Sequence, residues 1–474
     1  MRKAGNQGNL GIRSPRGTRI RFCFLEVTAL ESCHSAMYKS MSTNSPAPRL
    51  VALRHPDFRL LWSGQLISMI GTQMQFTAIN WHVYQLLRGT TYTLTLLGHS
   101  INLGAEALGL GTIGLVRVVP IVLLALVGGM IADTFDRRKI LMWTQGTAAT
   151  LAAILAVITL AGRDTLAAIY LLTAASAAAG AFDNPARQSL IPNLVPPEHL
   201  TNAVSLNTLN WQIGTILGPA VAGVMLGSFS IGWVYVANAA SFLAVLAALI
   251  IMRYRGGIAA TPSGLGWKPL MEGLRFVYGS RLIWSTMLLD FFATFFSSAR
   301  TMLPIVAGDV LGVGPVGYGI LSTAQSLGAV IAGVAASLRG DIRHQGATLL
   351  ISVAIYGLAT ALFGLSTAFV PSYALFALTG AADTVSTVIR SSLRQRITPD
   401  RLRGRMTAIN MIFFMGGPQL GELEAGLVAS AFGVAFAIVS GGIVTLLLTA
   451  WIAWRNPILR AYTSDQLTSA PAPA

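Results

Sequence analysis

The stretch Gly128–Lys139, GGMIADTFDRRK, joins two long apolar segments and decides how the rest of the chain is interpreted. Two glycines and Ala132 leave one helix face almost bare, so another helix can approach it closely. Asp133 follows where this helix should meet the membrane surface, and the cations Arg137–Lys139 come soon after. The stretch is either a charge-pairing device at a membrane boundary or a topogenic loop whose cations only hold it inside the cell.

Composition places the chain in a lipid bilayer. Its 474 residues are 53% hydrophobic and only 11% charged, with a mean hydropathy of +0.62, whereas soluble domains carry about 25% charged residues. A helix needs about 20 apolar residues to cross a bilayer, and the apolar runs here are continuous, unlike the alternating strands of a membrane β-barrel. The sequence predicts twelve spans: Phe58–Leu87, Gly109–Ala132, Ile140–Ala161, Leu166–Pro185, Thr201–Ser228, Gly232–Met252, Leu282–Val306, Val316–Leu338, Ala347–Leu365, Pro371–Ile389, Met406–Ala431 and Gly433–Trp454.

The net charge of +15 would suit nucleic-acid binding, but its distribution argues against that. With the amino terminus inside, nearly all Lys and Arg fall in inner segments, and only Arg88 and Arg163 fall in outer loops. An excess of Lys and Arg marks the cytoplasmic side. We therefore expect a multi-pass protein of the cytoplasmic membrane with both termini in the cytoplasm and no nucleic-acid partner.

The leading tail, residues 1–52, is polar and basic, and we expect it to be disordered. It has no apolar core of the kind found in signal peptides, and Met37 and Met41 are alternative start residues. The only cysteines, Cys23 and Cys33, lie in this tail, so neither a disulfide framework nor a metal site follows from them.

The chain is internally duplicated. Leu206–Gly223 and Ile409–Gly426 align in one register, and Arg59–Ser63 (RLLWS) answers Arg281–Ser285 (RLIWS). The matched pairs are Asn207/Asn410, Gly214/Gly417, Gly218/Gly421, Ala222/Ala425, Gly223/Gly426 and, in the same register, Arg187/Arg390. The sequence predicts six-helix bundles over residues 53–253 and 282–455 and a carboxyl tail over 456–474. A linker over 254–281 joins the bundles and holds an amphipathic helix, Trp267–Tyr278.

Two parallel six-helix repeats with both termini inside are the arrangement of major facilitator transporters. The stretch Gly128–Lys139 resembles that superfamily's signature between helices 2 and 3. The residues that match the signature are Gly129, Ala132, Asp133, Arg137, Arg138 and Lys139. Thr134 and Asp136 replace its usual Arg and Gly. The resemblance implies a conformational gate that pairs with helix 11, with Asp136 redistributing the pairing.

A second match lies in helix 5. Gly214, Gly218, Pro219 and Gly223 resemble the motif of drug–proton antiporters, with Ala222 in place of the usual glycine. Details such as Asn184–Arg187 resemble the superfamily's branch of enterobactin exporters and macrolide efflux proteins. The resemblance covers Leu53–Arg455.

Charges inside membrane spans are costly and are functional candidates by default. The candidates for proton coupling or substrate contact are Arg117, Asp290, Arg300, Glu422 and Glu424. Their structural alternative is simple neutralisation, with Arg117 pairing a carboxylate and Arg300 approaching the outer interface. Asp183 with Arg187 and Asp383 with Arg390 are predicted to be ion pairs that brace an inner gate.

Polar and aromatic side chains of helices 1 and 7 are candidates for lining a substrate cavity: Gln65, Gln73, Asn80, Phe291 and Phe295. The alternative for the aromatic residues is contact with lipid. His82 is expected near the outer surface and in solvent, and the insertion Thr90–Gly109 receives no role.

The favoured function is secondary active export of an amphipathic small molecule, a drug or a siderophore, driven by proton entry. The alternatives are uptake or translocation of a lysophospholipid by the same fold, a membrane-embedded transferase, or a sensor without flux. The sequence has no G-x-x-x-x-G-K-[ST] nucleotide motif. We expect no enzyme activity, no cofactor and no metal, and a monomer whose partners are the solute, protons and the bilayer.

Overall fold

The fold is a set of long apolar helices that run back and forth between two ends. A computed structural model describes residues 50–96, 99–255, 267–340, 342–399 and 402–463. The chain divides into Met1–Val51 and Ala52–Ala474, and the description below concerns the second unit. The predicted tail before Leu50 lies outside the described residues.

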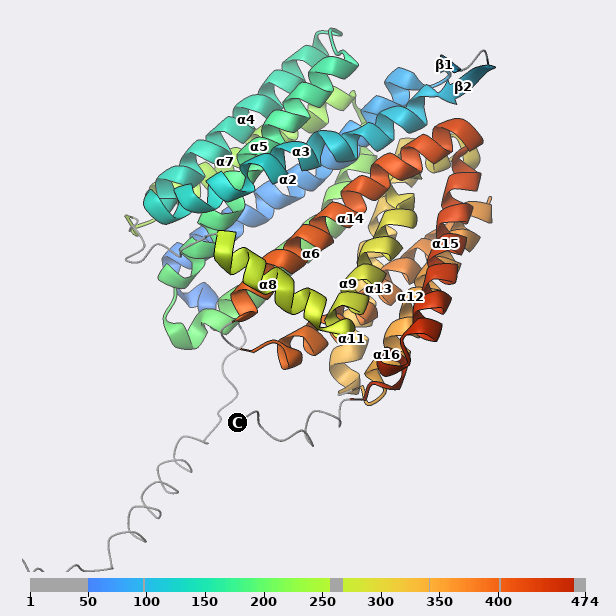
Figure 1. Cartoon of the computed structure of the whole chain (residues 1–474). Coiled ribbons are helices and arrows are strands. Elements are labelled where there is room, and N and C mark those ends of the chain that lie inside the picture. Colours follow the sequence, from blue (N-terminus) through green and yellow to red (C-terminus); the bar gives the residue numbers. More distant parts are fainter. Residues whose placement is uncertain (1–49, 97–98, 256–266, 341, 400–401, 464–474) are drawn as a thin grey trace, which may run out of the picture. The chain divides into compact units, whose positions relative to one another are not determined.

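The described part of the first repeat contains the six long helices α2 to α7 and one β-hairpin, which are labelled in Figure 1. In chain order its elements are η1 (Val51–Arg54), α2 (Pro56–Leu87), β1 (Thr91–Leu96), β2 (His99–Gly104), α3 (Ala105–Thr134), α4 (Arg137–Leu160), α5 (Leu166–Leu190), η2 (Ile191–Asn193), η3 (Pro197–His199), α6 (Leu200–Ser228) and α7 (Ile231–Ile251). Strands β1 and β2 are antiparallel, with Thr91 opposite Gly104. The insertion between the first two spans is therefore this hairpin.

The second repeat follows a helix, α8 (Trp267–Gly279), at the position of the expected amphipathic helix. Its elements are α9 (Arg281–Phe296), η4 (Ala299–Met302), α10 (Leu303–Ile305), the π-helix η5 (Val306–Val310), α11 (Gly314–Arg339), α12 (Gln345–Leu365), α13 (Phe369–Ile397), α14 (Arg403–Phe432), α15 (Val434–Arg455) and α16 (Pro457–Ala461).

Helix contacts repeat with the duplication. In the first repeat α2 packs on α6 and α7, α3 on α5, and α4 on α5 and α7. In the second, α9 packs on α14 and α15, α11 on α13, and α12 on α13 and α15, which are the equivalent pairs. The repeats meet where α3 packs on α14 and where α6 packs on α11. Because α3 corresponds to α11 and α6 to α14, each of these contacts is the counterpart of the other.

We name the two ends of this bundle by their features. The end where α3 meets α4 at Arg137–Lys139 is called the basic end, and the end that carries β1 and β2 is called the hairpin end. Figure 1 shows α8 and the hairpin at opposite ends of the helices. Helices α2, α6, α9 and α14 begin at the basic end.

Ten helices of the described chain are long and apolar enough to cross a bilayer. The predicted first span, within α2, is a long helix of lower mean hydropathy and is not among the ten. The predicted eleventh span lies within α14, only part of whose side chains are described. In α2 the physical reason is visible, because its polar side chains face other helices rather than lipid. Gln75 of α2, for example, accepts a hydrogen bond from Asn238 Nδ2 of α7 at 2.6 Å, and both side chains are buried.

The seventh span is broken, although the sequence predicts a continuous helix. Helix α9 ends at Phe296, and Ser297 and Ser298 separate it from η4. The hydroxyl of Ser297 lies 2.8 Å from that of Thr445, so a buried polar partner on α15 is available at the break. Asp290 and Arg300 therefore lie on different segments rather than on one face of a helix.

Candidate functional site

Residues of the stretch Gly128–Lys139 form hydrogen bonds that join helices of the first repeat at the basic end. The Asp136 carboxylate caps α4 by accepting a hydrogen bond from the backbone N–H of Arg138 at 2.9 Å. Arg137 donates to the carbonyl of Ser189, at the end of α5. Arg138 Nε donates to the carbonyl of Leu249 at 2.7 Å, near the end of α7.

These bonds satisfy helix carbonyls that have no partner within their own helix. The cations also stand at helix carboxyl ends, where positive charge is favourable. The surroundings of Gly129 and the side chain of Asp133 lie outside the described part of the structure, so pairing of Asp133 with helix 11 stays a prediction. Lys139 is exposed.

We expect Arg138→Gln to lower the free energy of unfolding by about 2–3 kcal/mol, because hydrogen bonds from a charged, buried guanidinium are lost. Thermal unfolding in detergent measures the change. Lys139→Gln is the matched control, and its exposed position predicts a change within about 0.5 kcal/mol. Equal stability of the two variants would contradict the structural role of Arg138.

The glycines of the helix-5 motif lie where α6 touches two neighbours. A Cβ added at Gly214 would lie 2.4 Å from Met69 of α2, and one at Gly218 would lie 2.4 Å from Gln73. At Gly223 it would lie 2.7 Å from the Cα of Gly319 on α11. The motif thus packs α6 within its own repeat through its middle, and against the other repeat nearer the hairpin end.

The equivalent contact joins α3 to α14. A Cβ at Gly426 would lie 2.6 Å from the Cα of Gly111, and one at Gly114 would lie 2.7 Å from the side chain of Glu422. Small residues let membrane helices approach backbone to backbone. Two glycine crossings therefore hold the repeats together in the hairpin-end half of the bundle.

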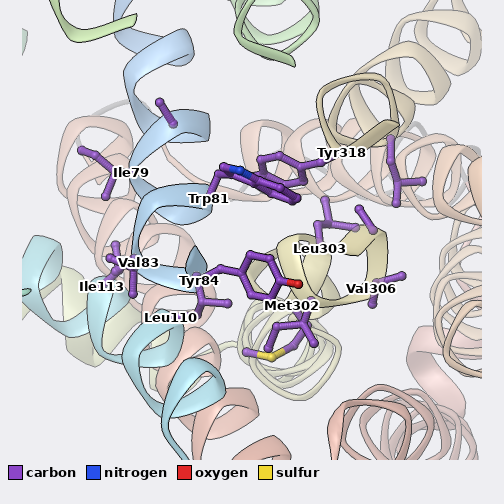
Figure 2. Close-up of a cluster of buried hydrophobic side chains, with 14 of the residues drawn as sticks. Ile79, Trp81, Val83, Tyr84, Leu110, Ile113, Met302, Leu303, Val306 and Tyr318 are labelled. Atoms are coloured by element: carbon purple, nitrogen blue, oxygen red, sulfur yellow. The ribbon is translucent and has the colours of Figure 1, made fainter. Parts of the chain in front are cut away.

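Aromatic and polar side chains also join the two repeats near the hairpin end. Figure 2 shows Trp81 beside Tyr318, and Tyr84 among side chains that include Leu303 and Met302. The rings of Trp81 and Tyr318 stack at 5.2 Å, and the Tyr318 hydroxyl donates to the carbonyl of Thr77. These contacts join α2 of the first repeat to α11 and α10 of the second.

A carboxylate completes this closure. Asp309 of η5 accepts hydrogen bonds from the Tyr84 hydroxyl at 2.8 Å and from Arg88 at 2.7 Å. We call Tyr84, Arg88 and Asp309 the hairpin-end latch. Tyr84 is buried, whereas the side chains of Arg88 and Asp309 are 58% and 34% exposed, so the tyrosine bond should contribute more than the solvent-screened ion pair.

We expect Asp309→Asn to favour opening of the hairpin end by about 1–2 kcal/mol, roughly a tenfold change in population, because a charged acceptor becomes neutral. Labelling of Ala78→Cys, a buried position of α2, by a maleimide measures opening in detergent after Cys23 and Cys33 are changed to Ser. Arg88→Gln should increase labelling less than Asp309→Asn does. Unchanged labelling in Asp309→Asn would exclude the latch.

The predicted pair Asp183–Arg187 is present one turn apart on α5. Asp183 also accepts from Thr144 Oγ1 at 2.9 Å and from Gln145 Nε2 at 2.7 Å, both on α4. A buried carboxylate with this many donors is well satisfied. The hydrogen bonds from Thr144 and Gln145 to Asp183 tie α5 to α4 near the basic end.

The other predicted pair has a different geometry. Arg390 of α13 does approach Asp383, at 3.7 Å, but its closer ion pair is with Asp290 of α9. Asp290 is 7% exposed and Arg390 2% exposed. The predicted pair of Arg390 with Asp383 is therefore present, and the packing of α9 near α13 brings a second carboxylate closer that the sequence did not predict.

The three side chains surround a small cavity. Asp290, Asp383 and Arg390 line it together with Thr294, Tyr356 and Ser386, and its volume of ≈ 10 Å³ suits about one water molecule. The Nε of Arg390 has no hydrogen-bond partner among the described residues. Two carboxylates thus share one guanidinium in a space too small for a solute but large enough for water.

The duplication shows how this site differs from its counterpart. The register that aligns Arg187 with Arg390 places Ser386 opposite Asp183, and the register that aligns Arg59 with Arg281 places Ser68 opposite Asp290. The arginine is common to both repeats, whereas its carboxylate comes from its own helix in the first repeat and from α9 in the second. Only the second arrangement links two helices through the pair.

The remaining charged candidates lie between the repeats. The guanidinium of Arg117 on α3 stacks over the ring of Phe76 at 4.1 Å and interacts electrostatically with Glu422 and Arg300. No ion pair to Glu422 or Glu424 is found among the described residues. Glu424 is half-buried on the same helix as Glu422.

The cavity candidates occupy varied positions. Gln65 and Gln73 are buried against neighbouring helices, and Asn80 is half-buried. Phe291 and Phe295 are half-buried and stack at 5.9 Å, and Phe291 also meets Phe413 of α14 at 6.0 Å.

His82 is not a solvated surface residue, contrary to the expectation from sequence. It is 3% exposed, and its ring nitrogens lie 2.7 Å from Asp164 Oδ2 and 3.1 Å from the Tyr235 hydroxyl. His82 and its two partners come from three places in the chain: α2, the loop before α5, and α7. No local sequence signal predicts such a contact.

Comparison with solved structures shows the fold. A bacterial homolog of the human lysosomal transporter Spinster, in an inward-facing unoccupied conformation, matches with a TM-score of 0.66, 14% identity and coverage of 88% of this chain and 99% of that one. A bacterial homologue of the iron transporter ferroportin matches with a TM-score of 0.61, 14% identity and coverage of 84% and 98%. With its two six-helix repeats, the protein is a multi-pass membrane protein with the major facilitator fold.

A family model described as "Transmembrane secretion effector" matches residues 47–474, so the chain belongs to this family of major facilitator secondary transporters. It is a transporter and not an enzyme. Among its relatives, the enterobactin exporter EntS of Salmonella typhimurium is 27% identical over 389 residues, covering 82% of this chain and 89% of the relative. EntS of Shigella boydii is 27% identical over 402 residues, covering 83% and 92%.

Proposed function

We propose that this protein exports an amphipathic small molecule, such as a macrolide or a siderophore, by proton antiport. The observation that supports this best is the buried pair of Asp290 and Arg390 between α9 and α13. A proton on Asp290 removes the charge that holds Arg390, and Asp383 is then its remaining partner. Proton binding would thereby change a contact between two helices, which is what coupling to a conformational change requires.

Glu422 and Glu424 are further candidates for the coupling carboxylate. Glu422 lies at the crossing of α3 and α14, where the repeats meet. A proton there would alter the charge at the interface that alternating access must open and close. The water-sized cavity and second carboxylate at Asp290 favour that residue as the main coupling group.

We place the basic end in the cytoplasm because Lys and Arg accumulate in its loops. The latch and the two glycine crossings join the repeats at the hairpin end, and these contacts support a state that is closed there. In the opposite state Asp133 would close the basic end by pairing with helix 11. We propose that residues 53–253 and 282–455 move as the two bundles, within a monomer in the cytoplasmic membrane.

The direction of transport is proposed from the relatives. EntS is named an enterobactin exporter, and at 27% identity this supports export without identifying the solute. The helix-5 glycines, which resemble those of drug–proton antiporters, support the same direction.

Everted membrane vesicles test the proposal. An imposed pH gradient, acid inside, should be dissipated when a transported macrolide, dye or catechol siderophore is added, and uptake of that solute should stop after an uncoupler. Vesicles without the protein are the control. Uptake that persists unchanged after uncoupling would show that export is not proton-driven.

A further inference from the structure

The charges between the repeats do not balance. Arg117 on α3, Arg300 on η4 and Glu422 on α14 lie on three elements that pack together between the repeats, and their formal charges are two positive and one negative. Element η4 packs against both α3 and α14. We call these three residues the inter-repeat cluster.

Neither arginine is matched by a carboxylate contact. Among the described residues no ion pair to Arg117 or Arg300 is found, and Arg117 Nε has no hydrogen-bond partner. Arg300 is exposed and Arg117 is half-buried, so protein atoms leave both side chains partly open. An unpaired charge at membrane depth is costly unless something neutralises it.

The cluster also lies beside the glycine crossing between α3 and α14. Gly114 contacts Glu422, and Gly111 contacts Gly426 one turn nearer the hairpin end. The cluster therefore begins on the basic-end side of the glycine crossing that closes the hairpin end. Phe76, beneath the Arg117 guanidinium, adds an aromatic surface.

We propose that the transported solute is an amphipathic anion whose acidic group binds between Arg117 and Arg300. The inference rests on the proposed transport function and names its substrate class. Guanidinium groups bind carboxylates and other oxyanions through paired, charge-assisted hydrogen bonds. Glu422 reduces the positive charge, so a proton on Glu422 would strengthen anion binding and link it to the proton.

Two xanthene dyes of similar size but opposite charge test the substrate class. Fluorescein carries a free carboxylate, whereas rhodamine 123 is cationic with its carboxyl group esterified. Fluorescence anisotropy on the purified protein in phosphatidylcholine nanodiscs should show binding of fluorescein at least tenfold tighter than that of rhodamine 123. Equal binding, preference for rhodamine 123, or no binding of either dye would overturn the proposal.

Variants locate the site. Arg117→Gln and Arg300→Gln should each weaken fluorescein binding by about tenfold or more, and Arg117→Lys should weaken it less than Arg117→Gln. Glu422→Gln should instead tighten fluorescein binding severalfold. A merely structural role for the cluster would not produce this opposite effect. Arg163→Gln, an exposed cation in the loop before α5, is the matched control and should bind as the unmodified protein does. Unchanged binding in both Arg117→Gln and Arg300→Gln overturns the proposal.

A lipid phosphate is the other source of such an anion. If fluorescein binds equally in phosphatidylcholine and phosphatidylglycerol nanodiscs, the site takes the solute. If phosphatidylglycerol abolishes binding, the site is a lipid site and the proposal fails. Fluorescein that binds as predicted but is not accumulated against a pH gradient would refute proton-driven export while leaving the anion site in place.

Discussion

Asp290→Asn is expected to abolish proton-coupled export and to lower the free energy of unfolding by about 3 kcal/mol. Breaking a buried ion pair typically costs about 3–5 kcal/mol, because one charge is left without its partner. Here the loss should be at the lower end, since Asp383 remains 3.7 Å from Arg390. Proton efflux per solute in everted vesicles and thermal unfolding in detergent measure the two effects.

A second variant separates coupling from stability. Asp290→Asn combined with Arg390→Gln removes both charges, so much of the lost stability should return, whereas coupled export should stay absent. Export at the normal rate in this double variant would show that the pair is structural and would remove Asp290 from the mechanism.

Asp57→Asn is the matched control for loss of a carboxylate. Asp57 accepts from the backbone N–H groups of Arg253 and Tyr254 at the basic end. We expect a loss of about 1 kcal/mol in the free energy of unfolding and an unchanged ratio of protons to solute.

Gly223→Leu is expected to reduce export by tenfold or more by holding the hairpin end apart. An added Cβ at Gly223 would lie 2.7 Å from the Cα of Gly319 and 3.1 Å from the carbonyl of Pro315. These are backbone atoms that cannot move without shifting a helix, and overpacking of this kind costs about 1–3 kcal/mol. The variant should therefore populate states in which α6 and α11 are separated.

Labelling of Ala78→Cys measures that separation directly. It should rise in Gly223→Leu and in Gly426→Leu, which disturbs the equivalent contact with Gly111. Gly146→Leu is the control, because nothing lies within 4 Å of a Cβ added there. If Ala78→Cys stays unlabelled by the maleimide in the Gly223→Leu protein, and if that protein exports normally, closure by the glycine crossings would be contradicted.

Much of the fold was predictable from local sequence. Ten of the described helices are contiguous apolar runs long enough to cross a bilayer, so composition alone locates them. The duplication was visible because Gly214–Gly223 and Gly417–Gly426 keep the same glycine spacing. In both repeats the first two glycines meet a helix of the same repeat, and the last one meets a helix of the other repeat.

The sequence by itself determined the membrane class, the twelve predicted spans, the duplication and the set of charged residues from which a site could be built. The tertiary structure decided which of those charges meet. Asp290 and Arg390 are far apart in the chain, and their contact depends on how α9 lies against α13. The same holds for His82 with Asp164 and for Arg138 with the end of α7. Apolar runs and glycine spacing are properties of a single helix, whereas a partner for a buried charge is set by which helix faces pack together.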